Sequence, residues 1–91
     1  MNEPIKDYIV TSHAVVEMRH RSIDEALVAR VLANPGQRLQ VRVGRDVLQS
    51  RIEFAGRVYL IRVFVDVDRS PAEVVTAYRT SKIEKYWRSE P

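Results

Sequence analysis

The segment TAYRTSKIEKYWR, residues 76–88, interleaves cationic and aromatic side chains near the end of the chain. Aromatic rings stack on unpaired bases while cations neutralise phosphates, so this mixture is typical of a contact with single-stranded RNA. A structural explanation is equally physical, because Ile83, Tyr86 and Trp87 are spaced i, i+3 and i+4 and could dock a terminal helix on the core. The residues that the RNA interpretation uses are Tyr78, Arg79, Lys82, Lys85, Tyr86, Trp87 and Arg88.

A second group of polar side chains lies near the start of the chain, where His13, Glu17 and His20 have the spacing i, i+4 and i+7. On a helix they project from one side, and nitrogen and oxygen atoms so placed can bind a divalent metal. The pattern is not HExxH, and we predict neither a metal nor a cofactor. We expect His20 on the surface and His13 capping the helix or packing at its start. His13 could also transfer a proton, since imidazole titrates near neutrality.

The balance of charge favours an anionic partner. Fifteen Lys and Arg residues stand against twelve Asp and Glu, a net charge of +3, and twelve of the fifteen are arginines. Residues 38–91 hold eleven basic and seven acidic side chains, so the C-terminal part carries the excess. The planar guanidinium binds phosphate bidentately, which points to a polyanion. A mildly basic, solvated surface is the alternative explanation.

Length and composition exclude several classes of protein. Ninety-one residues predict a single domain, 1–91, too small to enclose a deep cavity, so any chemistry belongs on an open face or shallow groove. The absence of cysteine excludes disulfides, thiolate zinc sites and a cysteine nucleophile. No apolar run approaches the ~18 residues of a membrane span, and the first ten residues lack the apolar stretch of a signal peptide. We therefore expect a cytoplasmic protein without a membrane partner.

Two helices should follow a short strand at residues 6–10. Thr11 or Ser12 offers the N-cap of a first helix that ends near Arg21. For the second helix, Ser22 followed by Glu25 has the spacing of a capping box. The sequence 34–36, Asn-Pro-Gly, should end that helix, because proline disfavours helical geometry in the residue before it. The apolar stripe of the second helix is formed by Leu27, Val28, Val31 and Leu32.

From residue 38 the hydrophobic period changes to two, which indicates strands. One strand runs up to Gly44, and residues 46–54 and 57–66 flank Ala55-Gly56 as a hairpin. A two-residue loop pairs Ile52 with Tyr59, Ser50 with Ile61 and Leu48 with Val63, and we expect these pairs on the core face. The opposite face would then mix arginines with apolar side chains, which suits a ligand. It carries Gln49, Arg51, Glu53 and Arg62, with Leu60 and Phe64 between them.

A last strand is expected at residues 73–79, after a turn at residues 68–71. Because Val74, Val75 and Ala77 are all apolar, alternation does not decide which face Tyr78 and Arg79 occupy. Residues 81–87 favour a short terminal helix. The predicted fold class is therefore α+β, with two N-terminal helices packed on a twisted antiparallel sheet of about four strands and a short C-terminal helix.

Four motifs connect these elements to a known family. The run S-H-A-x-x-x-M-x-x-R-x-I occupies residues 12–23, L-x-N-P residues 32–35, G-R-x-Y-L-I-x-V residues 56–63, and V-x-T-A-Y-R-T-S-K residues 74–82. In these motifs, over residues 8–88, the chain resembles an uncharacterised bacterial domain family grouped with the RelE/ParE-like toxins, near the BrnT-like branch. Two positions depart from that family's pattern. Glu17 stands where relatives often have a basic residue, and Ser22 stands where glycine is common and improves the expected helix cap.

The resemblance implies a RelE-like fold and a bacterial toxin–antitoxin role. Active toxins of this kind bind mRNA, often on the ribosome, and help a 2′-hydroxyl attack the adjacent phosphate. That reaction needs a base, an acid and cations for the charge on phosphorus. The implied catalytic roles are Arg79 and Lys82 as phosphate clamps with Arg51 or Arg62 as a further clamp, and Tyr78 or His13 for proton transfer; the RNA-binding set adds Lys85, Tyr86 and Arg88.

The leading hypothesis from the sequence is thus a cytoplasmic, RelE/BrnT-like mRNA interferase held by a cognate antitoxin. The alternative is a non-catalytic module that binds RNA or a protein through the face of Arg51, Leu60, Arg62 and Phe64. A small metal-binding protein, through the His13 group, is a third hypothesis. Free strand edges in so short a sheet allow a homodimer in addition.

Overall fold

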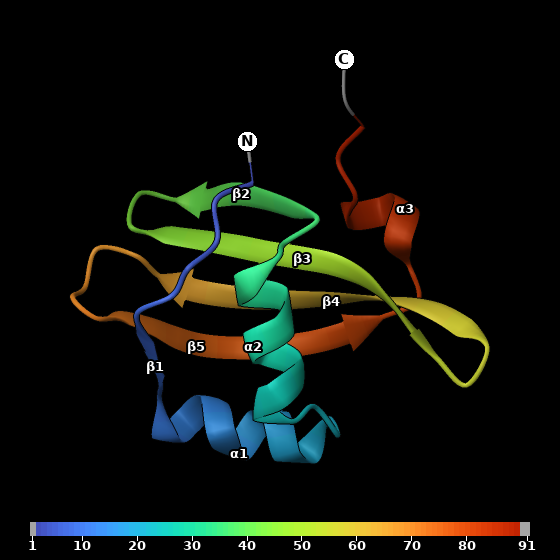
Figure 1. Cartoon of the computed structure of the whole chain (residues 1–91), viewed down its shortest axis with the longest axis horizontal. Helices are drawn as coiled ribbons and strands as arrows, with labels where there is room; N and C mark the ends of the chain where they lie inside the picture. The colour runs from blue at the N-terminus through green and yellow to red at the C-terminus, as the bar shows by residue number, and fades with distance from the viewer. Residues whose placement is uncertain (1, 90–91) are drawn as a thin grey trace.

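The computed structural model describes residues 2–89, which form a five-stranded sheet with α1 and α2 packed against one face (Figure 1). The strand order is β1-β5-β4-β3-β2. This architecture confirms the α+β class. The elements, in chain order, are β1 Tyr8–Val10, α1 Ser12–His20, α2 Glu25–Ala33, β2 Gln37–Arg42, β3 Arg45–Phe54, β4 Arg57–Asp66, β5 Ala72–Thr80 and α3 Ile83–Tyr86.

The expectation of about four antiparallel strands holds for β2 to β5, but it is wrong for the sheet as a whole. The sheet has five strands, and β1 joins it parallel to β5, with Tyr8 opposite Ala72 and Val10 opposite Val74. The physical reason lies at the edge of the sheet. Without β1, the first half of β5 would expose its backbone hydrogen-bonding groups, and a short parallel strand satisfies them. Figure 1 shows β1 leading directly into α1, which lies along the same edge of the sheet.

The hairpin of β3 and β4 has the register that its Ala55-Gly56 loop predicts. Ile52 faces Tyr59, Ser50 faces Ile61 and Leu48 faces Val63. Both loop residues have positive φ angles, 50° and 81°, as the turn types that match the twist of a hairpin require. We call the side of the sheet that meets α1 and α2 the inner face. Its core is formed by Ala14, Met18, Ile23, Val28, Val31, Leu32, Leu48, Ile52, Ile61, Val63, Val65, Val74 and Ala77.

An extra residue in β5 decides where the last side chains of that strand point. Phe64 pairs with Thr76, but the next residue of β4, Val65, pairs with Val74, so Val75 is inserted without a partner. Such a bulge shifts the alternation by one position. Beyond it, Tyr78 lies opposite Arg62 on the other side of the sheet, which we call the outer face. Arg79 lies opposite Ile61 and points to the inner face.

The caps of the two long helices differ from the expectation at one point. Thr11 caps α1, accepting a hydrogen bond from the Ala14 amide at 3.1 Å, but the predicted capping box of Ser22 and Glu25 does not form. Asp24 is the N-cap of α2, and its Oδ1 accepts from the Leu27 amide at 2.8 Å.

Ser22 instead ends α1. It has a φ of 56°, its amide donates to the Arg19 carbonyl at 3.2 Å, and the Ile23 amide donates to the Met18 carbonyl at 2.9 Å. These two bonds define a Schellman motif, in which the left-handed residue is usually glycine. A serine at this position therefore does not improve the cap of α2. α2 itself ends at Ala33, before Asn34-Pro35, as expected.

Substitutions at these two positions should change stability in opposite directions. Ser22→Gly should raise the free energy of unfolding by about 0.5–1 kcal/mol, because glycine adopts a positive φ without strain. Asp24→Ala should lower it by about 1 kcal/mol, because the Leu27 amide loses its acceptor. Urea unfolding followed by circular dichroism measures both. Destabilisation by Ser22→Gly of the size seen for Asp24→Ala would contradict this assignment and would indicate that Ser22 caps α2 in a capping box with Glu25.

Candidate functional site

The guanidinium of Arg62 lies at the centre of the outer face, held by side chains from three other elements. Its Nε donates to Oε1 of Gln49 on β3 at 2.8 Å, and its Nη1 donates to the hydroxyl of Tyr78 on β5 at 2.7 Å. Its Cζ lies 4.3 Å from the ring centroid of Tyr86 on α3 and 5.3 Å from that of Phe64. We call Arg62, Phe64, Tyr78 and Tyr86 the Arg62 cluster. It is a fixed cation surrounded by three aromatic rings.

A buried pair of amides fixes the C-terminal segment beside this cluster. Gln49 is 0% exposed, and its Nε2 donates to Oε1 of Gln37 at 2.8 Å and to the carbonyl of Tyr86 at 3.1 Å. Gln37 in turn donates from Nε2 to the Arg88 carbonyl at 2.6 Å and accepts from the Arg88 amide at 3.1 Å. A buried amide that loses its partner is costly, so these bonds specify how α3 and the residues after it dock.

Trp87 completes the docking of the terminal segment. Its ring lies against Gly36, and a Cβ on that glycine would come 2.9 Å from Cη2 of the ring. The guanidinium of Arg51 stacks on the same ring, with Cζ 4.2 Å from the centroid. Tyr86 and Trp87 thus dock the terminal segment, as one of the two interpretations expected, but on the outer face of the sheet rather than on the core. Docking also places the Tyr86 ring over Arg62. Tyr86 therefore anchors the terminal segment and also belongs to the Arg62 cluster.

The electrostatics of the cluster favour ionisation of a phenol. The pKa of Tyr86 is lowered, first by its hydrogen bond with Tyr78 and then by the positive charges of Lys85 and Arg62, which outweigh partial desolvation. The Lys85 ammonium lies 5.3 Å from the centroid of the Tyr86 ring. A phenol that packs edge to face on a second tyrosine beside two cations is suited to exchange a proton with a ligand.

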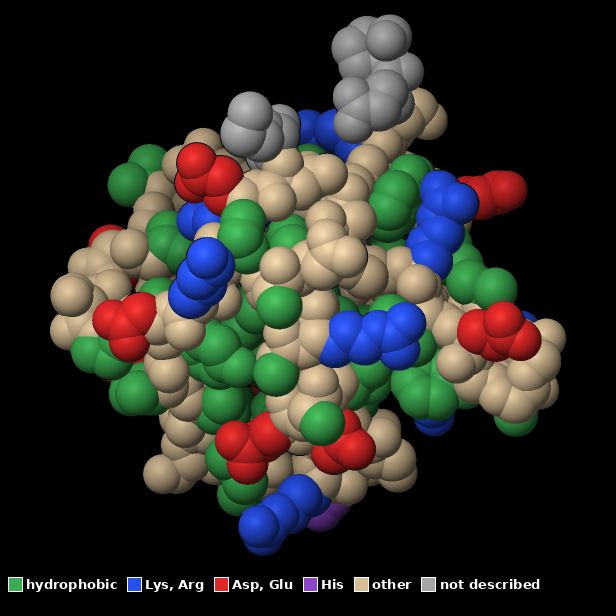
Figure 2. Space-filling model, viewed as in Figure 1, with side chains coloured by type: hydrophobic (Ala, Val, Ile, Leu, Met, Phe, Trp, Pro, Cys, Tyr) green, Lys and Arg blue, Asp and Glu red, His purple; other side chains and the backbone are tan. Residues whose placement is uncertain are grey.

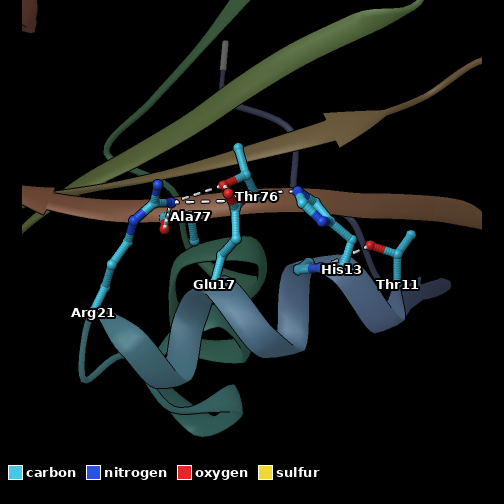
Figure 3. Close-up of polar contacts among 7 residues, drawn as sticks. Thr11, His13, Glu17, Arg21, Thr76 and Ala77 are labelled. Atoms are coloured by element: carbon cyan, nitrogen blue, oxygen red, sulfur yellow. Dashed lines mark hydrogen bonds and ion pairs between the residues drawn. The ribbon is translucent and has the colours of Figure 1, made fainter.

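A second polar network joins α1 to the outer edge of β5. Figure 3 shows Glu17 between His13 and Arg21 and directed at Thr76. Oε1 of Glu17 accepts from the Thr76 hydroxyl at 2.6 Å, and Arg21 donates to that hydroxyl at 2.9 Å and to the Ala77 carbonyl at 3.0 Å. The pKa of Glu17 is lowered, chiefly by the bond from Thr76 and also by the charges of Arg21 and His13.

His13 neither caps α1 nor packs at the start of that helix, contrary to the expectation. Its side chain is 76% exposed, and Nε2 lies 3.4 Å from Oε2 of Glu17. Thr76 and Tyr78 alternate on β5 and point to the same face, so the network of Glu17 borders the Arg62 cluster. His20 is exposed, as expected. Within residues 2–89, no three His, Asp or Glu side chains come together in a way that could hold a metal ion.

The structure divides the remaining predicted residues between two faces. Arg79 is on the inner face, with Cζ 5.0 Å from the ring centroid of Tyr59 and 5.4 Å from that of Phe54. It therefore cannot bind the same phosphate as Tyr78. Lys82 follows β5, where its amide donates to the Thr80 hydroxyl at 3.1 Å. Arg51 borders an outer hollow of about 710 Å³, whose lining also includes Val58, Ile83, Glu84, Trp87 and Ser89.

Sequence reasoning missed two residues of this site, Gln37 and Thr76, and the burial of a third, Gln49. Nothing in the sequence indicates that Gln37 is buried at this site, because a glutamine at the start of an edge strand is usually solvated. Gln49 is placed on the outer face by the hairpin register, but its burial arises from contact with a segment 37 residues later. Thr76 belongs to an expected strand, and only the position of α1 shows that its hydroxyl binds Glu17. Each role depends on a contact between distant segments.

Comparison with known proteins identifies one family. The family described as Domain of unknown function (DUF4258) matches residues 10–79. The match runs from the end of β1 to Arg79, so it includes Arg62 and Tyr78 and stops before α3. No curated protein and no solved structure matches the chain. Among residues 2–89, no helix has the length and apolar character needed to cross a membrane.

Gly36→Ala should loosen the docked terminal segment. The added methyl group would lie 2.9 Å from the Trp87 ring and 3.2 Å from the Gln49 carbonyl, so the ring must shift. Trp87 is the single tryptophan of the chain, so its fluorescence reports the shift directly. We expect a red-shifted emission maximum and easier quenching by iodide. Arg69→Ala, at an exposed position in the loop before β5, is the control for emission. Identical spectra for wild type and Gly36→Ala would contradict the contact.

The Glu17 network should make stability depend on pH. A lowered pKa in the folded state means that Glu17 stabilises the protein above its ordinary titration range and loses this effect as pH falls through the folded value. Glu17→Gln should therefore lower the free energy of unfolding at neutral pH, and its difference from wild type should vanish in acid. A double-mutant cycle with Thr76→Val isolates the pair. A difference that is constant with pH would refute the assignment.

Proposed function

This chain belongs to the DUF4258 family of domains, and we propose that it is a toxin-type endoribonuclease of the RelE/BrnT kind that binds single-stranded RNA on its outer face. The Arg62 cluster is the observation that carries the proposal. It combines a fixed guanidinium with the rings of Phe64, Tyr78 and Tyr86. Cations for phosphates and rings for unpaired bases are the two components of single-strand binding.

The arrangement of the elements supports the same proposal. Two N-terminal helices packed on one face of the sheet agree with part of what the RelE-like resemblance implies, although the sheet is mixed rather than antiparallel. The outer hollow beside Arg51 and Trp87 extends the binding surface beyond the cluster, and Lys85 adds a cation near Tyr86. The opposite, α2 side shows Lys and Arg interspersed with Asp and Glu among its described residues, rather than one basic patch (Figure 2). On the outer face, Arg51, Arg62 and Lys85 place cations beside aromatic rings.

The chemistry we propose is attack of a ribose 2′-hydroxyl on the adjacent phosphate. The 2′-oxygen forms a bond to phosphorus while the bond from phosphorus to the 5′-oxygen breaks, leaving a 2′,3′-cyclic phosphate and a 5′-hydroxyl. Arg62 neutralises the charge that develops on phosphorus. Tyr86, as its phenolate, accepts the 2′-hydroxyl proton, a role that its lowered pKa favours, and the Tyr78 hydroxyl gives its own proton to the leaving 5′-oxygen.

This scheme reassigns two residues. The phosphate clamp implied for Arg79 passes to Arg62, because Arg79 lies on the inner face. His13 borders the site rather than occupying its centre, so the proton-transfer role passes to the tyrosines. The proposal keeps the cytoplasmic setting, a cognate antitoxin, and RNA on the ribosome as the natural substrate. A homodimer through the free edge of β2 remains compatible with it.

A non-catalytic RNA-binding module is the second candidate, and one observation favours it. Arg62 and Tyr78 already hydrogen-bond each other, and Gln49 occupies Nε of Arg62, so these groups are bound even without substrate. Such a site can hold a phosphate without exchanging a proton. Affinity that falls steeply with salt, with no cleaved ends, would identify this function.

Tyr78→Phe tests the proposed cleavage. It keeps the ring that stacks on Phe64 and removes only the hydroxyl, so binding should persist while cleavage of a single-stranded RNA falls ~100-fold or more. Tyr8→Phe is the matched control, since it removes one hydroxyl from β1. The readouts are RNA ends mapped in vitro and growth of bacteria expressing each variant without a partner gene.

Arg79→Ala tests whether Arg79 or Arg62 binds the phosphate at which cleavage occurs. The outer-face site predicts that this variant cleaves RNA like wild type, whereas Lys85→Ala should weaken binding and reduce its salt dependence. Loss of cleavage in Arg79→Ala with a native circular dichroism spectrum would move the chemistry to the inner face. Full cleavage by Tyr78→Phe would remove the phenol from the mechanism.

A further inference from the structure

A second cluster of arginines and aromatic rings lies on the inner face, at the end of the sheet formed by the β3–β4 hairpin. Phe54 and Tyr59 meet edge to face with centroids 6.0 Å apart. Arg79 lies over both rings, and Cζ of Arg57 lies 5.4 Å from the Tyr59 centroid. We call Phe54, Arg57, Tyr59 and Arg79 the hairpin cluster. It is separated from the Arg62 cluster by the sheet itself.

A hollow of mixed lining adjoins this cluster at the start of α2. It has a volume of about 270 Å³; Ala26, Leu27 and Phe54 form its apolar part, and Ser22, Asp24 and Arg30 its polar part. Figure 2 shows basic side chains next to hydrophobic surface on this side of the molecule, beside α2. The hollow is large enough to take one aliphatic or aromatic side chain from a partner.

Arg30 of the hollow and the two arginines of the hairpin cluster have no carboxylate partners among the described residues. The ion pairs within residues 2–89 join Glu17, Asp46 and Asp66 to other cations, and none includes Arg30, Arg57 or Arg79. Asp24 also borders the hollow, but its Oδ1 caps α2 by accepting from the Leu27 amide. The three guanidinium groups therefore keep their capacity to bind carboxylates, which they do bidentately.

The rings of this cluster hold its cations in place, since Arg79 lies over Phe54 and Tyr59 and Arg57 lies near Tyr59. The cluster therefore presents guanidinium groups beside a hollow that has apolar side chains in its lining. That combination matches a chain with carboxylates flanking an apolar side chain.

We propose that the hairpin cluster and the adjoining hollow dock an acidic peptide segment of a partner protein. Carboxylates of the segment pair with Arg79 and Arg57, and an apolar side chain enters the hollow between Leu27 and Phe54. Arg30 contributes a third cation at the side of the hollow. This surface is distinct from the outer face and does not depend on the proposed ribonuclease function.

The test measures binding of the full chain to a fluorescein-labelled amphipathic peptide of glutamate and leucine by fluorescence anisotropy. Arg79→Glu should weaken binding ~10-fold or more, because it replaces an attractive charge pair with a repulsive one. Arg57→Glu should act in the same direction and provides a second variant if Arg79→Glu does not fold. Arg69→Glu makes the same charge change in the exposed loop before β5 and should bind within ~2-fold of wild type.

Two further probes test the chemistry of the ligand. A glutamate–serine peptide of the same charge should bind more weakly, since it lacks the side chain for the hollow. A single-stranded oligouridylate should bind Arg79→Glu and Arg69→Glu equally. Equal loss of peptide affinity in Arg79→Glu and Arg69→Glu would overturn the proposal, because nonspecific charge would then explain binding. Loss of oligouridylate binding in Arg79→Glu alone, with peptide binding retained, would overturn it in favour of RNA.

Discussion

The side-chain amide of Gln49 joins four parts of the molecule on the outer face. Its oxygen accepts from Arg62 on β4, and its nitrogen donates to Gln37 on β2 and to the backbone of Tyr86 on α3. Because the amide is fully buried, each of these bonds must form for the chain to fold without a penalty. The position of Arg62 and the docking of the terminal segment are therefore not independent features. A single polar side chain couples the sheet, the cation and the aromatic ring above it.

The two faces of the sheet use arginine in different ways. On the outer face, Arg62 is bound by hydrogen bonds and surrounded by rings, two of which carry hydroxyl groups. On the inner face, Arg79 lies over two rings beside a hollow, without an ion pair among residues 2–89. A fixed cation next to a phenol of lowered pKa suits reaction at a phosphate. An unpaired cation next to a partly apolar hollow suits association with a protein segment.

The edge of β5 shows how a short chain protects an exposed strand. β1 covers the first part of the edge by parallel pairing, and α1 covers the next part, at Thr76 and Ala77, through Glu17 and Arg21. The bonds made by Arg21 reach both the Thr76 side chain and the Ala77 backbone. Carboxylate, guanidinium and hydroxyl thus take the place of a neighbouring strand. His13, at the open side of this network, is left in solvent beside Glu17.

Local pattern in the sequence was enough to predict both long helices, the Ala55-Gly56 hairpin with its register, and the α+β class. These features depend on residues a few positions apart, through the helical and strand periods and the loop conformation. The tertiary structure alone decided that Tyr78 and Arg79 occupy opposite faces, because the extra residue in β5 exists only relative to β4. It also decided that β1 pairs parallel to β5, that Ser22 ends α1 in place of capping α2, and that Gln37 and Gln49 are buried. Each of these outcomes depends on contacts with neighbouring elements, whose positions a local pattern does not contain.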